Sequence, residues 1–200
     1  MIMRFYLLAT LLLLSSAGWS QLFQPGRLIT HAGDTLNGLV AVQSDNTFAY
    51  KPRKKGPRSL YHTRELSGYQ IGEEDFEEYE VEVIRKNFPE KVKSYLRVVE
   101  DGPLRLLEYR GPNIYGKEHV NYYLHNGYDA PYRVNRNPGN FKRTLKSYFA
   151  EVPALAEKIK QKEYQYGNLI EIVQEYNAWY IEREKDTPSE PADGNNEAPN

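Results

Sequence analysis

The stretch that decides the fold is Tyr95–Arg110, "YLRVVEDGPLRLLEYR". It contains two runs of alternating apolar and polar residues on either side of the dipeptide Asp101-Gly102. Asp-Gly is a strong hairpin signal, because the tightest hairpin turns need positive φ angles at their central residues. The stretch therefore predicts two antiparallel strands joined by a tight turn.

Further turn dipeptides repeat this arrangement along the first two-thirds of the chain. They are Gly33-Asp34, Asp45-Asn46 and Asn126-Gly127, and the runs between them are rich in Val, Ile, Leu, Tyr and Thr. Repeated hairpins predict an antiparallel meander rather than a parallel sheet with crossover helices. We expect the strands to cover about residues 27–134 and to form a roll or a partly closed barrel.

A helical pattern begins after the loop "VNRNPGN" at Val134–Asn140. Apolar residues there recur at helical spacing: Phe141, Leu145, Tyr148, Phe149, Val152, Leu155 and Ile159. We expect about three helices over about residues 140–184, the first capped by Asn140 and the second beginning at Pro153. The predicted fold class is α+β, with the helices packed on one face or end of the sheet.

The first residues, "MIMRFYLLATLLLLSSAGWSQ", have the pattern of a secretory signal peptide over residues 1–20. Arg4 supplies the positive end, Phe5–Leu14 is apolar, and Gly18 and Ser20 precede the expected cleavage site. The alternative is a membrane anchor, but a spanning helix needs about 20 apolar residues and this run is about half as long. We therefore expect an exported protein of the periplasm or the cell surface, with no transmembrane span in its mature chain.

The composition of the chain excludes several kinds of site and indicates how much of the chain folds. The chain contains no cysteine, which excludes disulfides, thiolate metal sites, cysteine nucleophiles and a lipoprotein anchor. Its net charge of −1 gives no long-range attraction to nucleic acid. We expect one domain over residues 21–184. The end, residues 185–200, is rich in proline and has no large apolar residue, so it is predicted to be disordered.

Two runs of like charge are interpreted as surface features. The basic run Lys51–Arg58 contains two prolines and a glycine, which favours a solvated hairpin loop. The acidic run Glu73–Glu82 continues as an alternating strand, with Val81 and Val83 facing inward. We expect the two runs to face each other. The alternatives are a polyanion site in the first run and a calcium site in the second.

No catalytic or metal-binding motif is found. The four histidines, His31, His62, His119 and His125, share no metal-ligand spacing, so we expect no metal and no cofactor. The polar segment "THAGDTLNG" is interpreted as a hairpin turn, in which Gly33 takes a left-handed conformation and Asp34 binds nearby amides.

Gly38, which follows inside the second strand, then needs a bulge or a close backbone approach. An enzyme that uses Asp34, or a carboxylate of Glu73–Glu82, with one histidine is the weakest alternative.

Several segments together resemble a known family. They are "GDTLNGLV", "LSGY", "YLRVVEDGPLRLLEY", "YYLHNG" and "FKRTLKSYFAEVPALAEKI", followed by "YGNLIEIVQEYN". In this order the chain is similar to uncharacterised exported proteins of Bacteroidetes-type bacteria over about Gly26–Asn177. The resemblance implies export and a strand-rich module with a short C-terminal helical segment. It implies no catalytic residues.

The sequence is most typical of a non-enzymatic envelope or cell-surface module that binds a protein partner. The alternative is a glycan-binding module that uses exposed tyrosines, of which the chain has 17 in total. The candidate contacts lie in "NYYLHNGYDAPY" and are Tyr122, Tyr123, Tyr128 and Tyr132. A hairpin there would place some of these rings on each face. We expect no nucleic-acid partner, and the sequence does not indicate an oligomeric state.

Overall fold

The computed structural model describes residues 23–44, 46–85, 88–112 and 118–186. The predicted signal peptide and most of the predicted disordered tail lie outside these residues. Contacts within the chain divide it into two compact units, residues 1–78 and 79–200. The predicted single domain over residues 21–184 stays a prediction, and the units are described separately.

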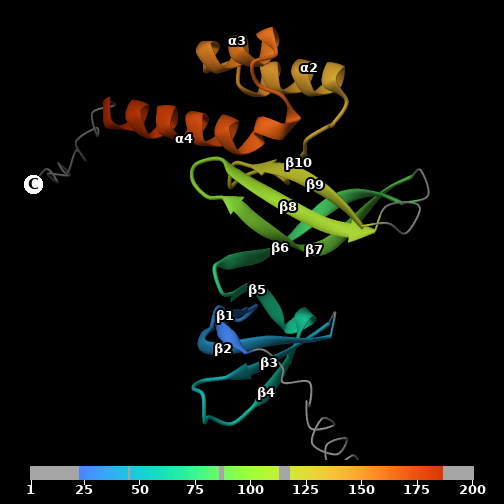
Figure 1. The fold of residues 1–200 in the computed structure, drawn as a ribbon, viewed down its shortest axis with the longest axis vertical. Coiled ribbons are helices and arrows are strands. Elements are labelled where there is room, and N and C mark those ends of the chain that lie inside the picture. Colours follow the sequence, from blue (N-terminus) through green and yellow to red (C-terminus); the bar gives the residue numbers. More distant parts are fainter. Residues whose placement is uncertain (1–22, 45, 86–87, 113–117, 187–200) are drawn as a thin grey trace, which may run out of the picture. The chain divides into compact units, whose positions relative to one another are not determined.

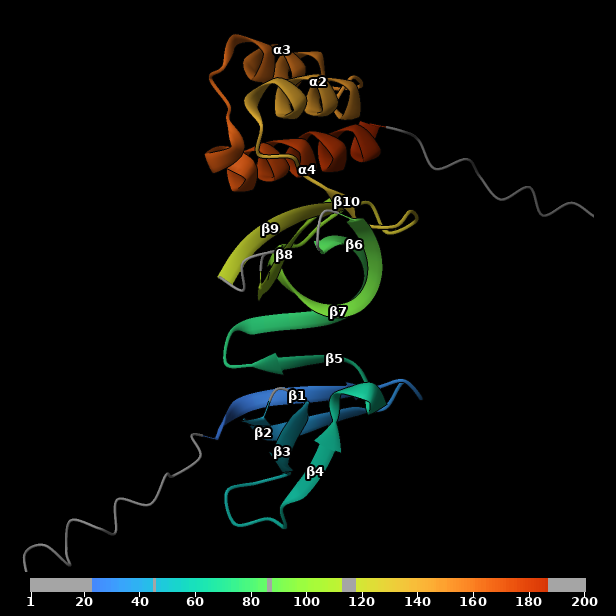
Figure 2. The same cartoon turned by 90° about the vertical axis from the view of Figure 1, so that its right-hand side faces the viewer.

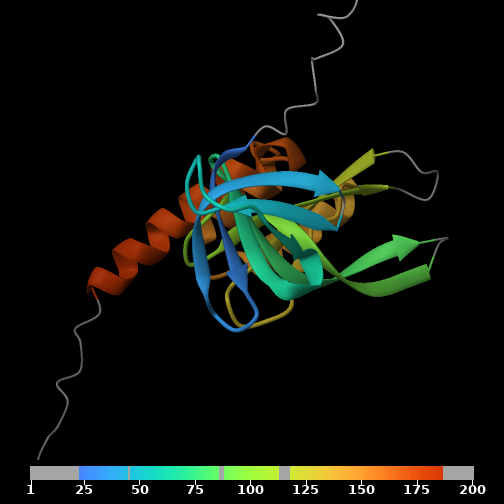
Figure 3. The same ribbon diagram turned by 90° about the horizontal axis from the view of Figure 1, so that it is seen from below.

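The first unit is an antiparallel sheet in the order β6-β5-β1-β2-β3-β4. Figure 3 shows its strands in blue and teal. The elements are β1 (Gln24–Thr30), β2 (Thr35–Ser44), β3 (Thr47–Lys51), β4 (Ser59–His62), the 3₁₀ turn η1 (Thr63–Glu65), β5 (Leu66–Ile71) and the first part of β6 (Glu74–Arg85). Buried Leu28, Val40, Phe48 and Leu66 supply its apolar interior.

The β1–β2 turn confirms the predicted first hairpin. The backbone N–H of Thr30 donates to the carbonyl of Asp34 at 2.9 Å, and Gly33 has a φ of +92°. The prediction that the Asp34 side chain binds nearby backbone amides was wrong. The hydroxyl of Thr30 accepts the backbone N–H of Asp34 at 3.2 Å, and the described residues include no hydrogen bond to the Asp34 carboxylate. Thr30 supplies the side-chain bond because it lies at the end of β1, directly before the turn.

Two glycines face each other in the middle of this hairpin, since Gly26 pairs with Gly38. A Cβ added to Gly38 would lie 2.3 Å from the carbonyl oxygen of Lys51, and one added to Gly26 would lie 2.2 Å from that of Gln70. The predicted close backbone approach at Gly38 is therefore confirmed. No larger residue fits at either position unless a neighbouring strand moves.

The charge runs take the predicted local structures. Most of the basic run lies in the exposed loop between β3 and β4. In the acidic run, Val81 and Val83 are buried. The expected pairing of the runs is wrong for Asp75, which forms an ion pair with Arg27 of β1 at 2.8 Å. Arg27 and Asp75 are both register partners of Gln70 in β5, the strand between β1 and β6, so their side chains meet across that strand.

The second unit continues the antiparallel meander in the order β6-β7-β8-β9-β10, followed by three helices. Its further elements are β7 (Phe88–Glu100), β8 (Arg105–Pro112), β9 (Glu118–His125), β10 (Tyr132–Arg133), α2 (Pro138–Tyr148), α3 (Pro153–Gln161), the 3₁₀ turn η2 (Tyr166–Asn168) and α4 (Leu169–Asp186). Figure 1 and Figure 2 show α4 between the α2–α3 pair and the sheet of this unit. Antiparallel strands followed by C-terminal helices confirm the predicted α+β class.

The strands β8 and β9 bury side chains on both faces. Leu106 and Leu124 belong to the cluster formed with the helices, whereas Leu107 and Tyr123 belong to a cluster on the opposite face. Burial on both faces fixes the strand register, because a slip by one residue would exchange the two sets of side chains.

The helix boundaries correct two predictions. The side chain of Asn137, and not that of Asn140, caps α2, since its Oδ1 accepts the N–H groups of Gly139 at 3.1 Å and Asn140 at 3.3 Å. Pro138 takes the first helical position, which favours the earlier start. Helix α4 also continues through Asp186, beyond the expected onset of disorder at residue 185.

No described helix has the length and apolarity that crossing a membrane requires.

Candidate functional site

The strongest candidate site is a cleft in the second unit, which we call the tyrosine cleft. Its volume is about 590 Å³. Its walls come from the β7–β8 turn, the segment after β9 and helix α4. The lining residues are Gly102, Pro103, Arg105, His125, Asn126, Gly127, Tyr128, Tyr176 and Tyr180. The cleft therefore combines three phenol rings with a guanidinium and an imidazole.

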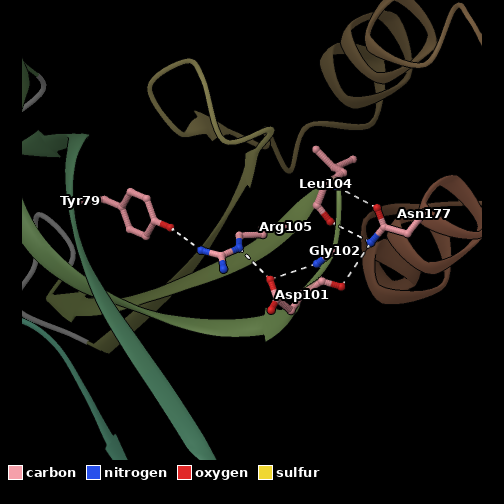
Figure 4. A network of polar contacts seen from close by, with 6 residues as sticks. All are labelled: Tyr79, Asp101, Gly102, Leu104, Arg105 and Asn177. Carbon is pink, nitrogen blue, oxygen red and sulfur yellow. Dashed lines mark hydrogen bonds and ion pairs between the residues drawn. The ribbon is translucent and has the colours of Figure 1, made fainter. Parts of the chain in front are cut away.

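The first wall is the tight turn between β7 and β8 (Figure 4). The carboxylate of Asp101 accepts the N–H of Gly102 at 3.0 Å and the Nε–H of Arg105 at 2.7 Å. Arg105 also donates from Nη1 to the hydroxyl of Tyr79 at 3.2 Å. These bonds hold the Arg105 guanidinium in one orientation beside the cleft, so it is positioned before any ligand arrives.

The same turn is held by a buried side chain of α4, as Figure 4 shows. Asn177 is 6% exposed, and its Oδ1 accepts the N–H of Leu104 at 2.8 Å while its Nδ2 donates to the Leu104 carbonyl at 2.9 Å. Gly102 has a φ of +147°, and a Cβ there would lie 2.5 Å from Asn177 Nδ2. The turn thus requires glycine for its conformation and for its contact with the helix.

The second wall is the turn after β9, which carries Tyr128. The Oδ1 of Asn126 accepts the N–H groups of Tyr128 and Asp129, each at 3.1 Å, and its Nδ2 donates to Asp129 at 3.0 Å. Gly127 has a φ of +87°, as the predicted Asn-Gly turn requires. The turn presents Tyr128 to solvent with 93% of its surface exposed.

The third wall is the face of α4 that carries Tyr176 and Tyr180, whose ring centroids lie 6.2 Å apart. The Tyr176 hydroxyl donates to Glu151 at 2.8 Å, and burial followed by this bond raises the pKa of Tyr176. The charge of Glu184, followed by burial, raises the pKa of Tyr180. Both phenols therefore stay neutral at physiological pH and can act as hydrogen-bonding and stacking groups.

The predicted contact residues separate into two pairs. Tyr122 packs against the helical cluster, with its ring 5.9 Å from that of Tyr166. Tyr123 is fully buried on the opposite face and donates its hydroxyl to the Glu82 carbonyl at 3.0 Å; burial raises the pKa of Tyr123 to about 12. A ligand could not reach the ring of Tyr123 without opening the core, whereas Tyr122 is half-buried beside the helices.

The other two predicted tyrosines are exposed. Tyr128 lines the cleft, and Tyr132 is 38% exposed with its ring 6.1 Å from that of Tyr148. The sequence reasoning missed Tyr176, Tyr180 and Arg105. The signal for the two helical tyrosines was their i, i+4 spacing, which places both on one face of a helix.

The residues named for the enzyme alternative come together only in part. His31 Nε2 lies 3.9 Å from Glu78 Oε2 in the first unit. Among the described residues no group of three histidine, aspartate, glutamate or cysteine side chains could hold a metal ion. Neither His31 nor Glu78 lines the tyrosine cleft.

No protein-family model, curated protein or solved structure matches this chain.

Proposed function

We propose that this protein is an exported, non-enzymatic module of the cell envelope or cell surface that binds a protein partner through the tyrosine cleft. The observation that carries the proposal is Tyr128, 93% exposed at the rim of a cleft whose other walls present Tyr176, Tyr180 and Arg105. Tyrosine and arginine are enriched among the residues that dominate binding energy at protein interfaces.

Pre-organisation supports the same proposal. Arg105 is held by Asp101 and Tyr79, and the backbone at Tyr128 is held by Asn126. Side chains and loops ordered before binding lose less entropy when a partner docks, which improves affinity. The signal-peptide pattern of residues 1–20 supports the extracytoplasmic location.

Site-specific photocrosslinking in intact cells tests this function. A photoreactive phenylalanine analogue replaces Tyr128 in one variant and Ile170 in the control, since Ile170 is also exposed on this unit but lies outside the cleft. We expect one discrete envelope protein to be attached at position 128 and not at 170. The additional substitution Tyr180→Ala should abolish that adduct.

Equal adducts at positions 128 and 170, or an adduct at 128 that survives Tyr180→Ala, would contradict the proposal. A melting curve of Tyr180→Ala provides the folding control. The Tyr180 side chain is only half-buried, so we expect the variant to remain folded.

The second candidate function is glycan binding, which the concave shape and the several tyrosine rings of the cleft favour. Sugars present apolar C–H faces and polar hydroxyls, and a tyrosine ring and its hydroxyl can contact both. On a glycan array, the wild type should bind a defined glycan, and the Tyr128→Ser variant should lose that binding. If the array gives no signal that depends on Tyr128, this second function is wrong.

A further inference from the structure

A second cavity of the same unit, which we call the cationic cavity, has a different chemical character. It lies among α2, α3 and η2, and its volume is about 410 Å³, within the range of about 300–1,000 Å³ typical of small-molecule sites. Its lining residues are Arg136, Pro138, Phe141, Lys142, Ile159, Lys162, Tyr164, Gln165, Tyr166 and Gly167. None of them belongs to the tyrosine cleft.

The base of the cavity is apolar and its walls are aromatic. Phe141 and Ile159 belong to the buried helical cluster, at 4% and 1% exposure. The Arg136 guanidinium lies over the ring of Tyr166, with its central carbon 5.0 Å from the ring centroid. Stacking of this kind restricts the guanidinium to a plane at the edge of the cavity.

Three cations surround this apolar base: Arg136, Lys142 and Lys162. Within the part of the chain that the structure describes, none of the three forms an ion pair with a carboxylate, and no carboxylate lines the cavity. The carboxylate of Glu175, which accepts the Tyr164 hydroxyl at 2.8 Å, is paired with Lys158 Nζ at 2.8 Å. The cavity therefore carries uncompensated positive charge.

The conformation of Lys162 adds a second observation. Its φ of +67° makes it the only non-glycine residue with positive φ among the described residues, and it ends α3 where glycine is normally favoured. A glycine at position 162 would adopt this positive φ without strain, and the substitution would remove no described ion pair. The lysine thus places a charge beside the cavity at a cost in stability.

We infer that the cationic cavity binds a small amphiphilic anion, in which a carboxylate or phosphate head is attached to an apolar body. The head would contact the three cations, and the body would lie against the more exposed apolar lining of Pro138, Tyr164 and Tyr166. Charge complementarity selects the head, and burial of apolar surface supplies affinity for the remainder. This inference is independent of the function proposed for the tyrosine cleft.

Isothermal titration of the full chain with octanoate, octyl phosphate, 1-octanol and octylammonium tests the inference, because the four probes have similar linear apolar chains, of seven carbons in octanoate and eight in the others. We expect at least one of the two anions to bind at least about tenfold more tightly than octanol or octylammonium. The comparison of octanoate with octyl phosphate distinguishes a carboxylate from a phosphate ligand.

Two variants and a matched control make the test specific. Lys142→Gln and Lys162→Gly should each weaken binding of the anion by at least about tenfold, which corresponds to about 1.4 kcal/mol, because each removes a charged hydrogen-bond donor. Lys160→Gln, which removes an exposed lysine paired with Glu157 on α3, should leave affinity unchanged. Lys162→Gly should also raise the melting temperature, so its loss of binding could not be explained by unfolding.

Equal affinity for octanol and octanoate, an equal loss in Lys160→Gln, or no binding of any anion at millimolar concentration would overturn the inference. A glutamate-rich peptide serves as a further probe. Its binding in place of the amphiphiles would overturn the inference too and assign the cavity to a protein ligand.

Discussion

The β1–β2 turn is held by bonds among its own residues and by a backbone bond from His31 to the Glu65 carbonyl, whereas the β7–β8 turn is held by a side chain from α4. A Cβ added to Gly33 would meet no atom within 4 Å, but one added to Gly102 would lie 2.5 Å from Asn177. Both turns contain a glycine and an aspartate. The difference shows that the same two residue types can form a turn with open space around its glycine or a turn packed against a helix that lines a site.

The centres of the hairpins differ as well. In the first, Gly26 faces Gly38 and the neighbouring backbones leave no room for a side chain. In the second, Arg97 faces Glu108, whose carboxylate is 3% exposed and accepts hydrogen bonds from Arg97 Nε and Nη2, both at 3.1 Å. The first hairpin depends on close backbone packing, and the second on specific polar contacts.

The largest effect is expected from Gly38→Ala. The new methyl group would meet a backbone oxygen of β3, so we expect a loss of about 4 kcal/mol in the free energy of unfolding. Denaturation followed by far-UV circular dichroism measures the loss. A loss below about 1 kcal/mol would show that the backbone contact at Gly38 is not rigid.

The same variant tests the predicted single domain, because the only tryptophan outside residues 1–20 is Trp179 of the second unit. If the units unfold together, the fluorescence midpoint of Trp179 should fall with that of circular dichroism. An unchanged fluorescence midpoint would contradict the single-domain prediction.

The next effect is expected from Asn177→Ala. The substitution leaves the buried N–H and carbonyl of Leu104 without their partner, and each such group costs about 1–3 kcal/mol. We expect a loss of about 3 kcal/mol, measured by the fluorescence of Trp179. The control is Gln174→Ala on the same helix, which removes one exposed hydrogen bond to Glu100 and should cost less than about 0.5 kcal/mol. Equal losses in the two variants would show that Asn177 contributes no more than a surface side chain.

A smaller effect is expected from protonation of Glu108. Burial opposes its ionisation, but the hydrogen bonds and charges of Arg110 and Arg97 outweigh burial and lower the pKa of Glu108. A lowered pKa in the folded state means that the stabilisation is present above about pH 4.5 and is lost as the pH falls through the folded value.

Acid titration of stability measures this contribution. We expect the wild type to lose about 1–2 kcal/mol more than Glu108→Gln between about pH 6 and pH 3. Parallel acid profiles for the two proteins would show that the arginines do not stabilise the ionised carboxylate.

The smallest effect is expected from Gly33→Ala. The new methyl group has open space, so only the left-handed backbone opposes it, at a cost of about 1 kcal/mol. Denaturation by urea, read by far-UV circular dichroism, measures it. A loss as large as that of Gly38→Ala would remove the distinction between an open turn and a close backbone approach.

The meander and the helices could be predicted because their signals are local. Turn dipeptides, alternating strands and the helical stripe that begins at Phe141 each reflect neighbouring residues. The glycine at position 38, inside a predicted strand, also indicated a bulge or a close backbone approach. Tyr128 was one of four candidate contacts, and the sequence did not indicate which of the four rings are exposed.

The candidate site could not be predicted as a whole, because its walls come from segments far apart in the chain. Asn177 lies 73 residues from Leu104, and nothing near either residue indicates the contact. Tyr123 was a candidate contact because its neighbours resemble those of Tyr122. Only the second core, on the opposite face of β9, explains why it is fully buried.

The central claim is that Asn177 of α4 holds the β7–β8 turn and so builds the tyrosine cleft. A double-mutant cycle of Gly102→Ala and Asn177→Ala, read by Trp179 fluorescence, tests it most directly. The combined loss should be smaller than the sum of the single losses by at least about 1 kcal/mol, because truncating Asn177 removes the atom that the new methyl group meets. The matched cycle of Gly33→Ala with Asn177→Ala should be additive within about 0.5 kcal/mol. Additivity in the Gly102 cycle would contradict the claim.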